Sequence, residues 1–380
     1  MGYRTRSRPN PALKPERLGW RPGLEGLRGV AVLAVMFYHF DATRDWFPGG
    51  SLGVDLFFVL SGFLITTLLL EERSRTGIVS LFSFYRRRGR RLLPALVFFL
   101  ALFAAISIIT KQPGADRLPL TVGTSLFYVF NWLDDFGGVA TKGAGHLWSL
   151  SVEEQFYLVW PIVLIMALRT GQRALFVLSL VLFVVSASLP AWSGRGQGTQ
   201  LYTGTDFRVQ QLMAGAILAQ LRFGGVVTPS VVNRPSFRLA AMLSVMFFVV
   251  FLFGLENRAV FLFAGGYTAA AVLGAVIVCA ALYAPPHILT NRVISYVGSR
   301  SYALYIWHHA IDFWMRDLDT VPGLALSVGL SFAAAEISWR LIERPSYLAR
   351  VRKEVHEWIT TSLGTIRRLR LATGHGGSQA

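Results

Sequence analysis

The amino-acid sequence predicts an all-α membrane protein with about ten transmembrane helices. Of its 380 residues, 53% are hydrophobic and 15% are charged, whereas about one quarter of the residues of a soluble domain are charged. Apolar runs of nearly spanning length follow one another from about residue 28 to residue 342, and a helix needs about 20 such residues to cross a bilayer. No separate soluble domain fits within these residues.

The apolar runs divide the chain into three parts. Residues 1–27 carry proline and scattered arginine and are predicted to form a disordered cytoplasmic lead, residues 28–342 the ten-helix membrane domain, and residues 343–380 a cytoplasmic tail. The predicted helices cover residues 28–44, 53–71, 92–110, 151–168, 174–192, 208–222, 238–254, 264–284, 297–315 and 323–341.

Basic residues flank the predicted spans. The formal net charge of +16 could indicate nucleic-acid binding, but its distribution argues against that function. With the N-terminus in the cytoplasm, most Lys and Arg fall in cytoplasmic segments, as the positive-inside rule requires. We therefore expect both termini to be cytoplasmic, with membrane lipid as a partner and no nucleic acid.

The single cysteine, Cys279, excludes a disulfide framework and a cysteine-based metal cluster, and no metal is expected.

The first span carries two ionisable side chains, Arg28 and His39. Eleven residues apart in a helix, they lie on one face and about 16 Å from each other along the axis, or half a bilayer. Ionisable groups within membrane helices are costly and usually face a polar cavity. The first span is therefore predicted to line such a cavity.

Two carboxylates are candidate partners of His39. Asp55 opens the second span at the level where His39 emerges and could orient the imidazole; alternatively, it caps the helix that it opens. Glu153 lies in the unusually polar opening of the fourth span and could be the acid/base partner of His39. The alternative for Glu153 is an ion pair with an arginine such as Arg28 or Arg208.

A dense cationic segment, "YRRRGRR", lies between the second and third spans. Its guanidinium groups could hold a phosphorylated cofactor through bidentate contacts. Alternatively, the segment sets the topology or binds lipid headgroups. The arginines concerned are Arg86, Arg87, Arg88, Arg90 and Arg91.

Further polar and aromatic residues recur near the ends of later spans and are candidate substrate contacts. Tyr305 and His308 share one helical stripe, from which His309 points about 100° away. A stripe of this kind is also typical of an interfacial aromatic belt. The candidate substrate-binding residues are His146, Trp148, Arg208, Tyr305 and His308.

Seven motifs follow one another along the chain: Arg28 and His39 with ten residues between them, "GVDLFFVLSGFL", the arginine cluster followed by "LLPA", "HLWSLSVEEQFYLVWP", "TDFRVQQLMAGAILA", "SYALYIWHH" and "IERP". Taken in order, these motifs resemble the bacterial acyltransferase family 3 of integral membrane O-acyltransferases. The resemblance covers nearly the whole hydrophobic chain. One departure is Ala310, where the family usually has proline; another is that no hydrolase-like C-terminal domain follows, so a stand-alone member is expected.

The resemblance implies a cytoplasmic acyl-CoA donor, with acetyl-CoA expected, and a hydroxyl acceptor on an envelope glycan, a glycolipid or a secreted metabolite. His39 would act as general base or accept the acyl group as an acyl-imidazole, with Glu153 and Asp55 as catalytic partners. The enzyme would reside in the bacterial inner (cytoplasmic) membrane. The expected phosphate-binding residues are Arg28, Arg86, Arg87, Arg90 and Arg91.

The alternative from another functional class is a multipass transporter or flippase for a lipid-linked glycan. In that case the intramembrane charges would line a transport pathway. Many secondary transporters contain repeated halves, and the sequence shows no internal repeat. Binding of acyl-CoA would decide between the two functions.

Overall fold

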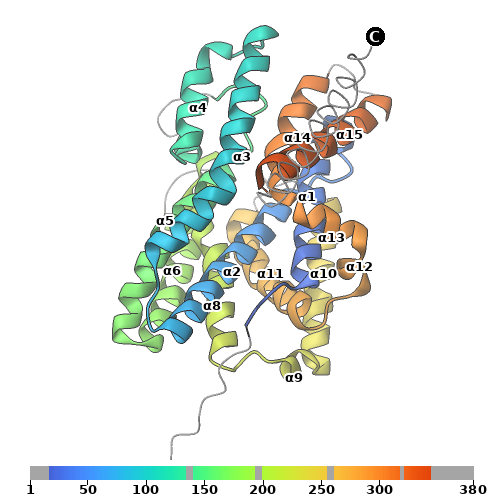
Figure 1. Cartoon of the computed structure of the whole chain (residues 1–380). Helices are drawn as coiled ribbons and strands as arrows, with labels where there is room; N and C mark the ends of the chain where they lie inside the picture. Colours follow the sequence, from blue (N-terminus) through green and yellow to red (C-terminus); the bar gives the residue numbers. More distant parts are fainter. Residues whose placement is uncertain (1–16, 134–139, 193–198, 255–260, 317–320, 344–380) are drawn as a thin grey trace, which may run out of the picture.

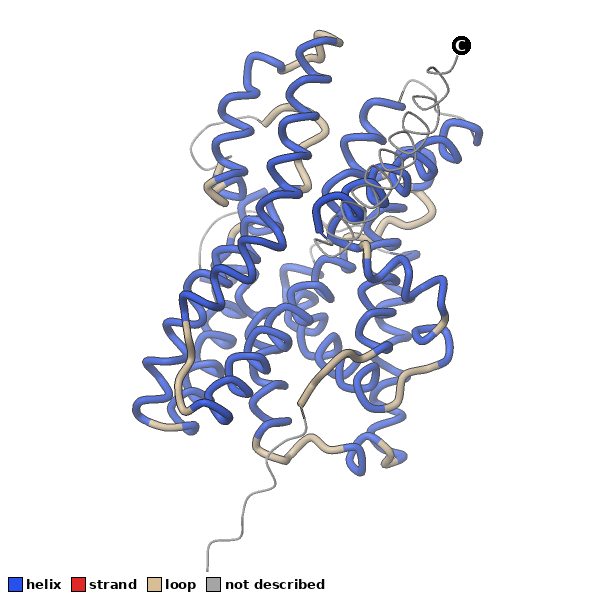
Figure 2. Tube along the Cα trace, in the orientation of Figure 1, coloured by secondary structure: helices blue, strands red, loops and turns tan. Residues whose placement is uncertain are grey.

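The computed structural model describes residues 17–133, 140–192, 199–254, 261–316 and 321–343. Every regular element in these ranges is helical, which confirms the predicted all-α class (Figure 2). The predicted cytoplasmic tail, except for its first residue, lies outside the described residues.

The described elements follow one another in this order: α1 (Pro22–His39), η1 (Asp41–Thr43), α2 (Leu52–Thr76), α3 (Leu81–Ile109), η2 (Ala115–Arg117), α4 (Leu118–Leu126), η3 (Phe130–Trp132), α5 (Leu147–Thr170), α6 (Gln172–Trp192), α7 (Thr199–Thr203), α8 (Thr205–Phe223), α9 (Pro229–Val232), α10 (Pro235–Gly254), η5 (Leu262–Gly266), α11 (Tyr267–Tyr283), α12 (His287–Thr290), α13 (Arg292–Ser299), α14 (Ser301–Met315), α15 (Val321–Ser338) and η6 (Trp339–Glu343).

Seven helices in the described part of the chain are long and apolar enough to cross a membrane. They are α2, α3, α5, α6, α10, α11 with the preceding turn, and α15 with the following turn. The other three predicted spans correspond to α1, α8 and the α13–α14 pair, which are helical but more polar or shorter. A count of ten spans and the cytoplasmic placement of both termini stay predictions.

Two differences between the predicted and observed helix boundaries concern candidate site residues. Helix α1 begins at Pro22 and ends at His39, whereas the predicted helix covers residues 28–44. Helix α3 begins at Leu81, so the arginine cluster that was expected between the second and third spans lies within this helix. Ser80 starts α3 by accepting a hydrogen bond from the backbone N–H of Ser83, and arginine is itself a good helix former.

Helices α2 and α8 form the centre of the bundle (Figure 1). Helix α2 packs against α8, α1 and α11, and α8 packs also against α6. Two glycines bring the backbones of α2 and α8 together: a Cβ on Gly62 would collide with the carbonyl oxygen of Leu212, and one on Gly215 with that of Val59. Small residues are the usual means of close helix packing in membranes.

The substitution Gly215→Ala should destabilise the protein strongly. Its added methyl group must push α2 and α8 apart, and overpacking of this kind costs about 1–3 kcal/mol or more. The matched control is Gly329→Ala on α15, where a Cβ meets no atom within 4 Å and alanine should stabilise the helix by up to about 1 kcal/mol. Thermal unfolding of both purified variants in detergent is the measurement; equal midpoints would refute the close packing of α2 and α8.

Candidate functional site

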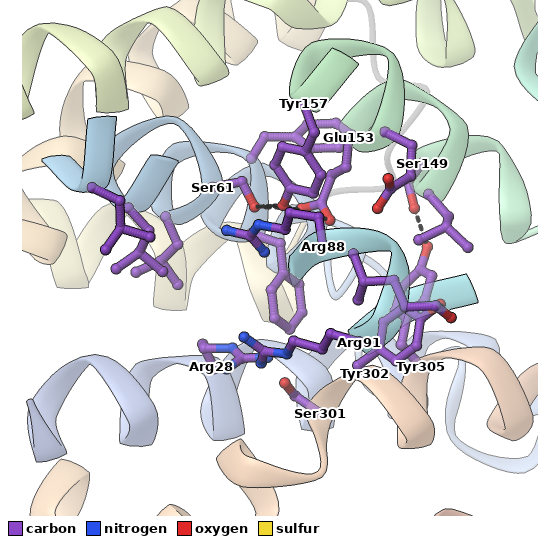
Figure 3. Close-up of a pocket in the computed structure, with 18 of the residues that line it drawn as sticks. Arg28, Ser61, Arg88, Arg91, Ser149, Glu153, Tyr157, Ser301, Tyr302 and Tyr305 are labelled. Atoms are coloured by element: carbon purple, nitrogen blue, oxygen red, sulfur yellow. Dashed lines mark hydrogen bonds between the residues drawn. The ribbon is translucent and has the colours of Figure 1, made fainter. Parts of the chain in front are cut away.

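Two of the cavities in the described part of the chain are lined by candidate site residues. The first, of about 540 Å³, is called here the arginine cavity (Figure 3). Its walls come from α1, α2, α3, α5 and α14 and from the segment before α1. Its polar lining residues are Arg17, Arg28, Ser61, Glu71, Arg88, Arg91, Ser149, Glu153, Glu154, Tyr157, Ser301, Tyr302 and Tyr305.

Two arginines of α3 line this cavity. Arg88 and Arg91 are three residues apart and so share one face of the helix. Arg91 lies close enough to Arg28 of α1 for the two like charges to repel each other (Figure 3), and the ion pair of Arg28 with Glu25, at 3.7 Å, is a loose one. Glutamates also line the cavity, but the wall around Arg28 and Arg91 presents positive charge that suits an anionic ligand.

The remaining predicted phosphate-binding arginines do not line the cavity. Arg87 pairs with Glu72 of α2 at 3.3 Å, the guanidinium of Arg86 lies over the ring of Phe82, and Arg90 is exposed. Arg87 is four residues from Arg91, so helical periodicity alone would also place it on that face, and its ion pair with Glu72 accounts for its different position. Arg88 was not in the expected phosphate-binding set, and only the packing of α3 shows that it lines the cavity.

Glu153 belongs to the arginine cavity and does not contact His39, contrary to the sequence-based expectation. Its carboxylate accepts hydrogen bonds from Ser61, at 2.8 Å, and from Tyr157, at 3.3 Å. Tyr157 also donates to Ser61 at 2.7 Å, and the guanidinium of Arg88 lies over the tyrosine ring. This network fixes Glu153 from two helices, because Ser61 comes from α2 and Tyr157 from α5.

The second cavity, of about 520 Å³, is called here the histidine cavity. His39 ends α1, His146 precedes α5 and His309 lies in α14, so three distant parts of the chain supply its imidazoles. The lining residues are Tyr38, His39, Arg44, Ser51, Val54, Phe130, Asn131, Leu133, Ala140, Gly145, His146, Trp148, Tyr202, Thr203, Tyr305 and His309.

The two cavities share Val54 and Tyr305 in their walls. The hydroxyl of Tyr305 donates to the carbonyl oxygen of His146 at 2.9 Å and also bonds to Ser149. Arg28 lies in the first half of α1 and His39 ends this helix, and each side chain lines a different cavity. The sequence predicted one polar cavity along the first span; the structure instead places the two side chains in two cavities that have Val54 and Tyr305 in common.

Asp55 and Arg208 are buried partners of each other, and neither lines the arginine cavity or the histidine cavity, where Arg208 was expected to contact substrate. The Arg208 guanidinium lies 3.2 Å from the Asp55 carboxylate, which also accepts a hydrogen bond from Gln211 at 2.7 Å. Asp55 is thus neither the partner of His39 nor a helix cap, since α2 begins three residues before it. The ring of Trp148, which does line the histidine cavity, lies under the Arg208 guanidinium at 5.4 Å.

His308 lies behind His39 and not in the cavity, contrary to its predicted role in substrate binding. It is fully buried, and its Nε2 is 3.1 Å from Nδ1 of His39. The neighbouring His309 reaches the cavity instead, with its ring centroid 4.6 Å from that of His39. His309 is not among the predicted substrate contacts, because the predicted stripe runs through Tyr305 and His308, and only the packing of α14 against α1 shows which face meets His39.

The chain is similar in sequence to known acyltransferases. An acyltransferase domain family matches residues 21–339. The O-acetyltransferase OatA of Staphylococcus aureus strain NCTC 8325 / PS 47 and that of strain COL are each 33% identical over 356 residues. The alignments cover 85% of this chain and 57% of each relative, so the chain spans little more than half their length. No solved structure matches the chain.

The single substitutions Asp55→Leu and Arg208→Met should each destabilise the protein by about 3–5 kcal/mol, because each leaves its partner as an unpaired buried charge. The double variant should recover most of that loss. A double-mutant cycle on thermal unfolding of the purified protein measures the coupling. Strictly additive losses would contradict a direct buried pair.

Proposed function

This chain belongs to the acyltransferase family, and from that membership and its two cavities we propose that it is a membrane O-acyltransferase that carries an acyl group from acyl-CoA to a hydroxyl. The proposal rests mainly on the two adjoining cavities, of which one is lined by arginines and the other by histidines. Arg28 and Arg91 face one cavity, and His39 faces the other across Tyr305.

The arginine cavity is the proposed donor site. Coenzyme A carries phosphate groups, and guanidinium groups bind phosphate through charge-assisted hydrogen bonds. Arg28 and Arg91 face each other and their like charges repel, so an anion bound between them lowers the electrostatic energy of both. Glu153, held by Ser61 and Tyr157 in the same cavity, would accept hydrogen bonds from the amide N–H groups of the pantetheine arm.

The histidine cavity is the proposed site of transfer. A thioester that reached past Tyr305 would meet His39, about 16 Å along α1 from Arg28 by the rise of the helix. His39 would act there as general base on the acceptor hydroxyl, a role that typically contributes about 10²–10⁴-fold to the rate. In this arrangement the donor enters from the cytoplasm, and the acceptor binds on the opposite side of the bacterial inner membrane.

The proposed acceptor is a hydroxyl of an envelope glycan, a glycolipid or a secreted metabolite, and the proposed donor is acetyl-CoA. The lining of the histidine cavity supports this class of acceptor. Tyr38, Trp148 and Tyr202 offer aromatic faces, and Asn131 and Arg44 offer polar groups. Apolar surface with a few convergent polar groups is typical of small-molecule sites.

The variant Arg91→Gln should bind acetyl-CoA about 10-fold or more weakly, because a charge-assisted hydrogen bond is worth about 1.5–3 kcal/mol. Arg90→Gln is the matched control, since the neighbouring arginine does not line the cavity. Equilibrium titration of acetyl-CoA into each purified variant is the measurement. If both variants bound like the parent protein, the donor site would have to lie elsewhere.

The variant His39→Ala should lose acyl transfer while it still binds acetyl-CoA, because the imidazole takes part in chemistry and not in docking. Acyl transfer is measured with radioactive acetyl-CoA as donor and the envelope fraction of cells lacking the gene as acceptor. The product is the radioactivity that becomes bound to the envelope fraction and is released by base. Turnover above about a tenth of the parent rate would overturn the role of His39. If the parent protein did not bind acetyl-CoA, the transporter alternative would take precedence.

A further inference from the structure

The backbone around His39 fixes which of its ring nitrogens carries hydrogen. Nδ1 of His39 lies 3.0 Å from the carbonyl oxygen of Val35. Because a carbonyl oxygen only accepts hydrogen bonds, Nδ1 must be the donor. In the neutral ring the lone pair then lies on Nε2, and His39 lines the histidine cavity. This is the tautomer that a general base needs.

His308 is fixed in the same way. Its Nδ1 lies 3.0 Å from the carbonyl oxygen of Leu304, one helical turn earlier in α14, so this nitrogen is also an N–H donor. The lone pair of His308 is therefore on Nε2, which lies 3.1 Å from Nδ1 of His39. The N–H of His39 is shared between the Val35 carbonyl and this second imidazole.

The position behind the base is the one that a carboxylate occupies in a Ser-His-Asp arrangement, where a third group orients the imidazole and stabilises its protonated form. Neither candidate carboxylate reaches it. Asp55 is bound to Arg208 and Gln211, and Glu153 is bound to Ser61 and Tyr157 in the other cavity. Among the described residues, the side chain that contacts Nδ1 of His39 is that of His308.

We propose that His308 is the positioning residue of the base: its Nε2 accepts the hydrogen bond from Nδ1–H of His39, holds the ring and stabilises the imidazolium that forms during transfer. The inference rests on the proposed function and adds a residue to it. A neutral partner suits this place, because a carboxylate buried here without a cation would carry a large desolvation cost.

The transfer step balances with this arrangement. The acceptor O–H bond breaks and its proton moves to Nε2 of His39, while the oxygen forms a C–O bond with the thioester carbonyl carbon. The C–S bond then breaks, and the thiolate of coenzyme A takes the proton from Nε2. Nδ1–H stays on His39 throughout, and its hydrogen bond to His308 strengthens while the ring is charged.

Two amide substitutions separate the two hydrogen bonds of His308. Asparagine can place an N–H near the position of Nδ1, and so keeps the bond to Leu304, but it is too short to reach His39. Glutamine can place its carbonyl oxygen near the position of Nε2, and so keeps the acceptor for His39. Neither side chain titrates.

We expect His308→Asn to lower kcat about 10- to 100-fold with an unchanged KM for acetyl-CoA, and His308→Gln to stay within a few-fold of the parent kcat.

The measurement uses the full-length purified protein, radioactive acetyl-CoA and the envelope fraction of cells lacking the gene, together with an acetyl-CoA titration and a thermal unfolding midpoint for each variant. Equal kcat values for the two variants, whether both normal or both lost, would overturn the role of His308 as an acceptor. His39→Ala serves as the reference. If that variant is inactive while His308→Asn is fully active, only this inference fails; if His39→Ala is active, the proposed function itself fails.

Discussion

The close contact between α2 and α8 holds the centre of the helical bundle together. Gly62 and Gly215 let the two backbones touch, and the Asp55–Arg208 pair joins the same helices where no water can replace a lost partner. Because α2 is held in this way, its remaining faces can serve the site. Val54 forms part of the wall of both cavities.

The location of the site follows from the cost of polar groups in a hydrocarbon environment. Helices α1, α8 and α14 carry His39, Arg208 and His308, and such side chains must face the interior of the bundle or a cavity. Helix α1 packs against α14, where His39 meets His308, and α8 packs against α2, where Arg208 meets Asp55. Functional groups that are far apart in the sequence therefore meet inside the bundle.

A single helix sets the spacing between the two halves of the site. Arg28 and His39 belong to α1, so the rise of an α-helix fixes their separation along the axis whatever the neighbouring helices do. Their partners come from elsewhere: Arg91 from α3, and His308 from α14. A bound thioester would thus be positioned by one rigid element, while separate helices would supply the cation and the second imidazole.

Hydropathy and helical periodicity are local properties, so the sequence was enough to predict the helical class and the place of Arg28 and His39 on the first helix, although not the helix boundaries. The partners of the buried polar groups depend on the tertiary structure. Asp55 met Arg208 instead of His39, Glu153 met Ser61 and Tyr157, and His308 took the place behind the base. Periodicity shows which residues share a face of one helix, but the partner of a buried polar group depends on which helices pack together and at what height.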